Sequence, residues 1–172
     1  MMEGFLGAHG YAPGPTQRPL LAGAIAGLIA TAPAIPLLIL FGSLRVESHI
    51  LGIGTGMTLA GGGLAMAVAG AIYGRLFGRA ANDRRGGWLF GMAFGFILWA
   101  GGAVMVLPLA SGGRVPAGLP ALGLILSLVV WGGALGILLP FVHRPLHRSL
   151  VDAAGRGGTG PGAAAGVRLA RQ

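Results

Sequence analysis

The chain contains no cysteine and no lysine, and only 9% of its 172 residues are charged. The absence of cysteine excludes disulfides, thiolate metal sites, iron–sulfur clusters and thiol catalysis. So low a share of charge also argues against a water-facing surface, because soluble domains carry about 25% charged residues. Apolar residues make up 54% of the chain, which excludes intrinsic disorder for most of it despite 35 glycines and 11 prolines. These values indicate a protein that crosses a membrane several times.

Four apolar runs are each long enough to cross a bilayer, which takes about 20 residues. None of them contains an ionisable side chain of the Asp, Glu, Arg, Lys or His type. They predict an all-α, polytopic membrane protein, a bundle of four transmembrane helices with Gly-rich packing faces. A polar tail (1–18) precedes this domain (19–148), and a Gly/Ala/Arg-rich tail of flexible composition (149–172) follows it. The predicted spans are residues 19–41, 50–73, 87–109 and 119–142.

The first run has an alternative interpretation as a cleavable signal peptide. Arg18 precedes it, and the triplet Ala30-Thr31-Ala32 resembles a small-residue cleavage site. Because the apolar run continues well past that triplet, we favour a retained helix.

All 12 basic residues are arginine. With four spans and a cytoplasmic N-terminus, ten of them lie on the inner side and two, Arg45 and Arg114, on the outer side. This asymmetry is the one that membrane insertion favours. We therefore expect a multi-pass protein of the bacterial inner membrane with both termini in the cytoplasm. On the same grounds the net charge of +8 reflects orientation in the membrane and not nucleic-acid binding.

Small residues recur at four-residue spacing along the predicted helices. In lipid, such residues let two helix backbones approach closely. We expect helix packing at these positions, either within one chain or between protomers. The glycines concerned are Gly54, Gly62, Gly70, Gly74, Gly87, Gly91 and Gly95.

Two prolines lie inside the first run. Pro33 and Pro36 cannot donate a backbone hydrogen bond, so the carbonyls of Ile29 and Ala32 lose their usual partners. We favour a simple kink. The alternative is a functional helix break, whose free carbonyls coordinate a cation or a substrate.

Two features of the last run need polar partners. Trp131 lies near its middle, and we expect its indole N–H to donate to a backbone carbonyl. His143 and His147 are four residues apart, the spacing of two metal ligands on one helix face, but Pro145 lies between them. We favour contact of both histidines with lipid headgroups over a metal or haem site.

The loop between the second and third runs is rich in arginine. Its single acid, Asp83, has four arginines around it as candidate partners, so the loop is interpreted as a clasp that closes the hairpin. The alternative is a contact site for an anion or an anionic phospholipid headgroup. The candidate residues are Arg75, Arg79, Arg84 and Arg85.

Three stretches resemble a known group of proteins. Residues Tyr73–Phe77, Arg79–Gly91 and Gly136–Pro145 are similar to those of small, four-helix bacterial inner-membrane proteins of the YagU type. The resemblance covers the last three helices. It implies an inner-membrane location and a stress-related role, and it supplies no catalytic residues.

No paired carboxylates and no Ser/His/Asp grouping are visible, so we expect no enzyme, no cofactor and no metal site. The predicted function is that of a structural or accessory membrane protein, either a homo-oligomer or a small subunit of a larger complex. The alternative is a channel or facilitator for a small neutral or anionic solute. The expected partners are the lipid bilayer, anionic phospholipid and another membrane-protein chain.

Replacing Arg84 and Arg85 by alanine tests the role of the arginine loop. Removing two positive charges should weaken the cytoplasmic anchoring of the loop or its retention of anionic lipid. Cysteine-accessibility mapping and lipid analysis of the purified protein measure these two effects. Unaltered topology together with unaltered retention of anionic lipid would remove the case for this loop.

Overall fold

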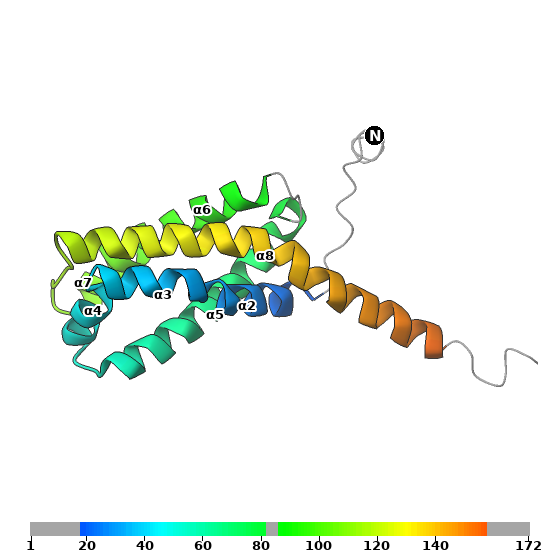
Figure 1. Ribbon diagram of the computed structural model, residues 1–172, viewed down its shortest axis with the longest axis horizontal. Coiled ribbons are helices and arrows are strands. Elements are labelled where there is room, and N and C mark those ends of the chain that lie inside the picture. The colour runs from blue at the N-terminus through cyan, green and yellow to red at the C-terminus, as the bar shows by residue number, and fades with distance from the viewer. Residues whose placement is uncertain (1–17, 82–85, 158–172) are drawn as a thin grey trace, which may run out of the picture.

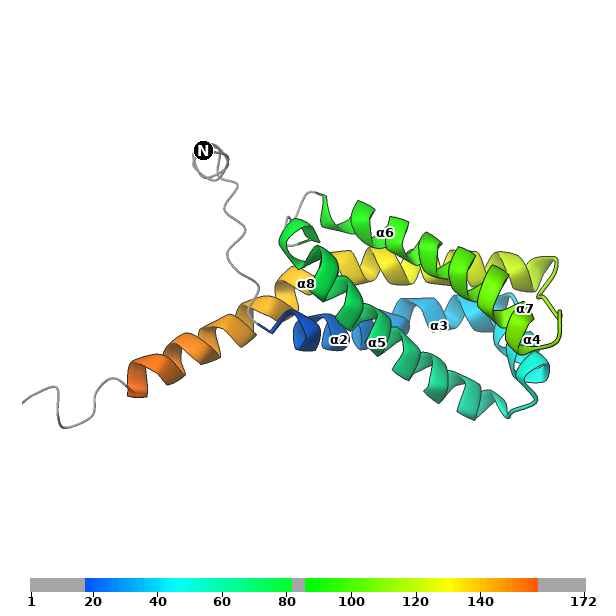
Figure 2. The same ribbon diagram turned by 180° about the vertical axis from the view of Figure 1, so that it is seen from behind.

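The computed structural model describes residues 18–81 and 86–157, and all regular structure in these ranges is helical (Figures 1 and 2). Four segments are long and apolar enough to cross a membrane: Pro19–Leu40, Thr55–Gly78, Gly87–Leu109 and Leu119–His143. The prediction of an all-helical chain with four such segments is therefore confirmed. The helices are α2 (Pro19–Ile29), α3 (Thr31–Leu40), α4 (Ser43–Leu51), α5 (Thr55–Ala81), α6 (Gly87–Leu98), the π-helix η1 (Trp99–Val106), α7 (Leu107–Ala110) and α8 (Leu119–Gly157).

The second span begins later than the sequence predicts. Residues Ile50 and Leu51 belong to α4, a separate short helix, and α5 starts at Thr55. Two glycines delimit α4, because Gly42 (φ 71°) and Gly52 (φ 68°) both have the left-handed backbone that interrupts a helix. The Ser43 hydroxyl, at the start of α4, donates a hydrogen bond of 2.8 Å to the Pro120 carbonyl of α8. This contact fixes α4 against the beginning of the last helix.

Residues 149–157, which the sequence analysis assigns to a tail of flexible composition, are helical. They continue α8, which runs without interruption to Gly157 and includes Pro145. Residues 158–172 lie outside the described part of the chain, as do residues 1–17 of the predicted N-terminal tail.

Helices α2 and α5 pass each other in backbone contact. A Cβ atom added to Gly27 would lie 2.9 Å from Cα of Gly70, and one added to Gly74 would lie 3.0 Å from Cα of Gly23. No side chain fits between the two helices at these points. The crossing therefore depends on glycine from both sides.

Helices α6 and α8 make a second contact of the same kind. A Cβ on Gly91 would lie 2.8 Å from the carbonyl carbon of Gly132, and one on Gly95 would lie 2.9 Å from that of Leu128. Further along, a Cβ on Gly136 would meet the backbone of buried Gly87. The last span thus lies directly against the third.

Helix α8 joins the two helix pairs. Within the most apolar 18-residue stretch of each span, 44% of the residues are buried in the fourth and only 17% in the second. The α8 side chains Trp131, Leu135 and Leu139 are fully buried, and they pack in one core with alanines of α2 and α3. Figure 1 shows α3 running alongside α8.

Helix α5 follows α2 closely at one end and diverges from α3 at the other (Figures 1 and 2). Its end near Gly70 and Gly74 lies against α2. Toward Thr55 it contacts α4, while most of its side chains are exposed. The space between α5 and the rest of the molecule widens in this direction.

The tight crossing predicts opposite outcomes for two glycines of α5. Gly70→Ala should lower the stability of the protein by at least about 2 kcal/mol, because the added methyl group meets the backbone of α2. Gly61→Ala should be neutral or slightly stabilising, since Gly61 has no atom within 4 Å of the added position. Thermal unfolding in a mild detergent compares the two variants. Equal stabilities would contradict the assigned crossing.

Candidate functional site

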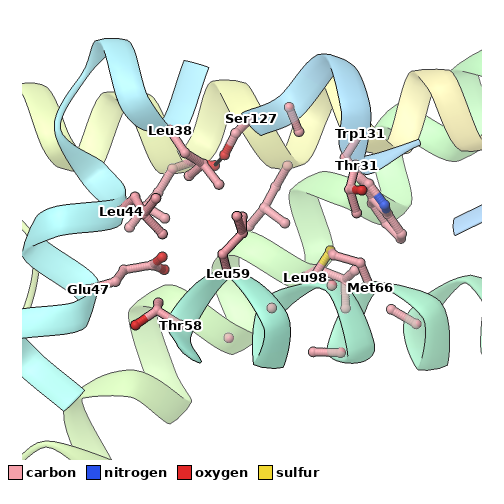
Figure 3. A pocket seen from close by; sticks show the side chains of 18 of the residues that line it. Thr31, Leu38, Leu44, Glu47, Thr58, Leu59, Met66, Leu98, Ser127 and Trp131 are labelled. Atoms are coloured by element: carbon pink, nitrogen blue, oxygen red, sulfur yellow. Dashed lines mark hydrogen bonds between the residues drawn. The ribbon is translucent and has the colours of Figure 1, made fainter. Parts of the chain in front are cut away.

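A pocket of about 700 Å³ occupies the space where α5 diverges from α3 (Figure 3). Its walls come from α3, α4, the first part of α5, η1 and α8. Most lining residues are leucine, alanine or glycine. The polar side chains in the lining are Thr31, Glu47, Thr58, Ser127 and the indole of Trp131.

The three hydroxyl groups of the pocket donate to backbone carbonyls three or four residues earlier in the chain. Thr31 donates to Leu28 at 2.6 Å, and Ser127 donates to Leu124 at 2.9 Å. Thr58 donates across 3.2 Å to the carbonyl one turn before it. These hydroxyls are satisfied, and none of them is hydrogen-bonded to a base that would activate it as a nucleophile.

Trp131 closes the pocket at the end away from α4. Its indole N–H donates to the carbonyl of Gly27 at 2.8 Å, and its side chain is 1% exposed. The expectation that a backbone carbonyl accepts from this indole is confirmed. Its ring lies 6.3 Å from that of Phe94, and further contacts extend from Phe94 to Tyr73. This aromatic cluster fills the region beyond the pocket.

The two prolines of the first span lie in α3, just after the interruption at Ala30. Pro33 is the third residue of α3, and the helix continues through Pro36. In a continuous helix the N–H of residue 33 would donate to the Ile29 carbonyl, and Pro33 has no N–H. The interruption at Ala30 lies directly after that carbonyl. The hydroxyl of Thr31 and the indole of Trp131 supply donors to carbonyls in the same turn.

Glu47 is the residue of the pocket that the sequence analysis missed. Its carboxylate points from α4 into the pocket, beside Thr58 (Figure 3). It lies between the predicted spans, where acidic residues are common and do not indicate a site. A signal was nevertheless present, because Leu44, Glu47 and Leu51 are spaced as one face of a helix, and all three line the pocket.

The Glu47 carboxylate has no hydrogen-bond or ion-pair partner among the described residues. Burial raises its pKa above the usual value, because the charged form loses hydration. The neighbouring basic groups on α4, Arg45 and His49, are exposed and do not line the pocket. Glu47 is therefore a partly buried acid facing a mostly apolar space.

One wall of the pocket is an eight-residue π-helix, η1. Its residues Gly102, Ala103 and Val106 line the pocket. Pro108 follows directly in α7, and it can neither donate to the preceding turn nor fit its ring there without a local change. A wider helical turn is one way of relieving this clash, and it leaves a wall of small side chains.

The predicted arginine site lies only partly in the described residues. Arg75 is exposed on α5, Arg79 lies in the last turns of α5, and Arg84 and Arg85 lie outside the described part of the chain. Close to this loop, the buried Tyr73 hydroxyl donates to the Gly87 carbonyl at 3.2 Å. This bond joins α5 to the start of α6.

The glycines singled out in the sequence divide into two groups. Those at the backbone contacts with α2 or α8 are Gly70, Gly74, Gly87, Gly91 and Gly95. Gly54 and Gly62, in contrast, have no atom of the described residues, beyond their own local backbone, within 4 Å of an added Cβ. Gly62 lines the pocket and Gly54 does not.

His143 lies at the end of the fourth span and is only 7% exposed. The expectation that its side chain faces lipid headgroups is therefore wrong. His147 belongs to α8, and the described residues contain no group of three His, Cys, Asp or Glu that could hold a metal ion.

Comparisons with protein-family models, curated proteins and solved structures give no significant match.

The buried carboxyl predicts a pH dependence of stability. At acidic pH Glu47 is protonated in the folded and unfolded states alike, and stability is lost as the pH rises through the raised folded-state pKa. Glu47→Gln cannot ionise, so it should become more stable than the wild type as the pH rises. Melting temperatures between about pH 4 and about pH 8 measure the difference. Arg45 and His49 are common to both proteins, so parallel curves would contradict this assignment.

Proposed function

We propose that this chain is a non-enzymatic membrane protein that acts by assembling with another transmembrane segment. The partner is a second copy of the chain or a subunit of a larger complex. Its location is the bacterial inner membrane with both termini in the cytoplasm, as the arginine asymmetry supports. The resemblance to YagU-type proteins supports the same location. The chain is proposed to fold as a four-helix bundle with Gly-rich packing faces.

The observation that carries this proposal is the uncovered outer face of α5, formed by Met57, Gly61 and Val68 and continued by Gly54 directly before the helix. Both glycines have no atom within 4 Å of an added Cβ, and Met57 and Val68 are 68% and 55% exposed. None of the four lines the pocket. In lipid, a helix surface of this kind lets a neighbouring backbone approach closely. The crossings at Gly70 and Gly91 illustrate this mode of contact within the chain.

The hydrogen bonds of the pocket support a role without catalysis. Each hydroxyl in the lining donates to a backbone carbonyl, and Glu47 has no described partner that would orient it as a base. Catalysis of acyl or phosphoryl transfer needs a nucleophile, a base and a stabilising donor that converge. The described lining offers no such convergence.

A facilitator for a small solute is the second candidate. The pocket favours it, because it reaches both Thr58 and Thr31, beside the proline segment. A pathway, however, would have to continue past Trp131 and the crossing of α2 and α5, where side chains and backbones are in contact. A carboxylate at Glu47, in the pocket lining, would also repel an anionic solute. The candidate is thus restricted to neutral or cationic solutes.

Gly61→Leu tests the assembly. The leucine side chain should hold a partner helix away from the outer face of α5 and weaken association roughly tenfold. Native mass spectrometry of the protein, extracted gently from its own membranes, gives the stoichiometry. The matched control is Gly62→Leu, on the same helix but in the pocket lining. A wild-type protein that is monomeric and without foreign subunits would refute the proposal, as would unchanged stoichiometry in Gly61→Leu.

A further inference from the structure

The pocket lining is mostly apolar, and its ionisable side chain, Glu47, lies at the α4 end (Figure 3). Leu98, Met66 and Trp131 lie toward one end, while Glu47 and Thr58 lie together at the α4 end. The hydroxyls and the indole already donate within the protein. The hydroxyl oxygens can still accept a hydrogen bond, but among the described lining residues Glu47 is the side chain that can carry a charge toward a ligand.

An unpaired carboxylate beside an apolar space selects for the charge of an occupant. A protonated amine offers a compensating charge and up to three N–H donors. An alcohol offers one donor and no charge, and a carboxylate or phosphate group would be repelled. The basic side chains nearest in sequence, Arg45 and His49, are exposed and do not line the pocket, so neither supplies the compensating positive charge there.

We propose that the pocket binds a single-chain amphiphile with a cationic amine head, with the amine at Glu47 and the alkyl chain lying against α5, η1 and α8 toward Trp131. The volume of about 700 Å³ falls within the range of small-molecule sites. A phospholipid with an amine head fits less well, because its phosphate would lie close to the same carboxylate. The proposal is independent of the assembly proposed above, which uses the outer face of α5.

Three probes with the same alkyl chain test it: dodecylamine, dodecanol and dodecanoate. Binding to the purified full-length chain in a non-ionic detergent is followed by native mass spectrometry and by the shift in melting temperature. We expect one saturable site per chain, with dodecylamine binding roughly tenfold more tightly than the alcohol or the acid. Equal binding of the three probes would overturn the proposal.

Three variants locate the site. Glu47→Gln should reduce dodecylamine to the affinity of dodecanol without changing that of the alcohol. Gly62→Leu should weaken the binding of all three probes, because Gly62 lines the pocket. Gly61→Leu, outside the lining, should leave their affinities unchanged. If Gly62→Leu fails to fold, Glu47→Gln decides the question alone. The proposal is overturned if Glu47→Gln still binds dodecylamine more tightly than dodecanol.

The same spectra separate this proposal from the proposed function. If Glu47→Gln loses the preference for the amine but keeps its oligomeric state, the amine site is supported. The proposed assembly is then tested separately by Gly61→Leu. Phosphatidylethanolamine that co-purifies on the chain and is not displaced by dodecylamine would identify the occupant as a phospholipid, and it would refute the single-chain amine.

Discussion

Contact between glycine backbones determines how this molecule is built. Apolar side chains gain little by leaving lipid for one another, so association inside a membrane depends on close van der Waals contact. Here that contact occurs at two crossings, between α2 and α5 and between α6 and α8. A helix held tightly at one end by such a crossing cannot follow every neighbour at the other end. The divergence of α5 from α3, and with it the pocket, follows from where the glycines lie.

Trp131 connects the two crossings. It belongs to the helix that packs on α6, yet its indole N–H binds the Gly27 carbonyl in the helix that packs on α5. A hydrogen bond in so buried a place is costly to break without a replacement. The same residue thus ties the helix pairs together and sets the inner limit of the pocket.

The sequence predicted the spans well, because length and hydropathy alone decide whether a segment can cross a bilayer. It predicted only in part which glycines pack against another helix. A stripe at four-residue spacing rotates by about 40° at each step around a helix of 3.6 residues per turn. Over the four steps from Gly54, directly before α5, to Gly70 this rotation reaches about 160°. Only the later part of the stripe therefore meets α2. No single stripe could pack along its whole length.

The pocket could not be predicted in this way. Glu47 lies between the apolar runs, and its relevance depends on α4 turning back against α5 and α8. That turn depends on the left-handed backbone at Gly42 and Gly52, and such local geometry leaves no mark in hydropathy. The burial of His143 likewise results from the neighbours that α8 acquires in the folded chain.

The length of α8 has a mechanical consequence. A single helix from Leu119 to Gly157 is about 58 Å long, against a hydrocarbon core of about 30 Å. Its final turns must therefore project beyond the apolar layer as a stalk continuous with the last span. A force applied to the stalk acts on the same rod that bears Trp131. The stalk and the inner wall of the pocket therefore belong to one continuous helix.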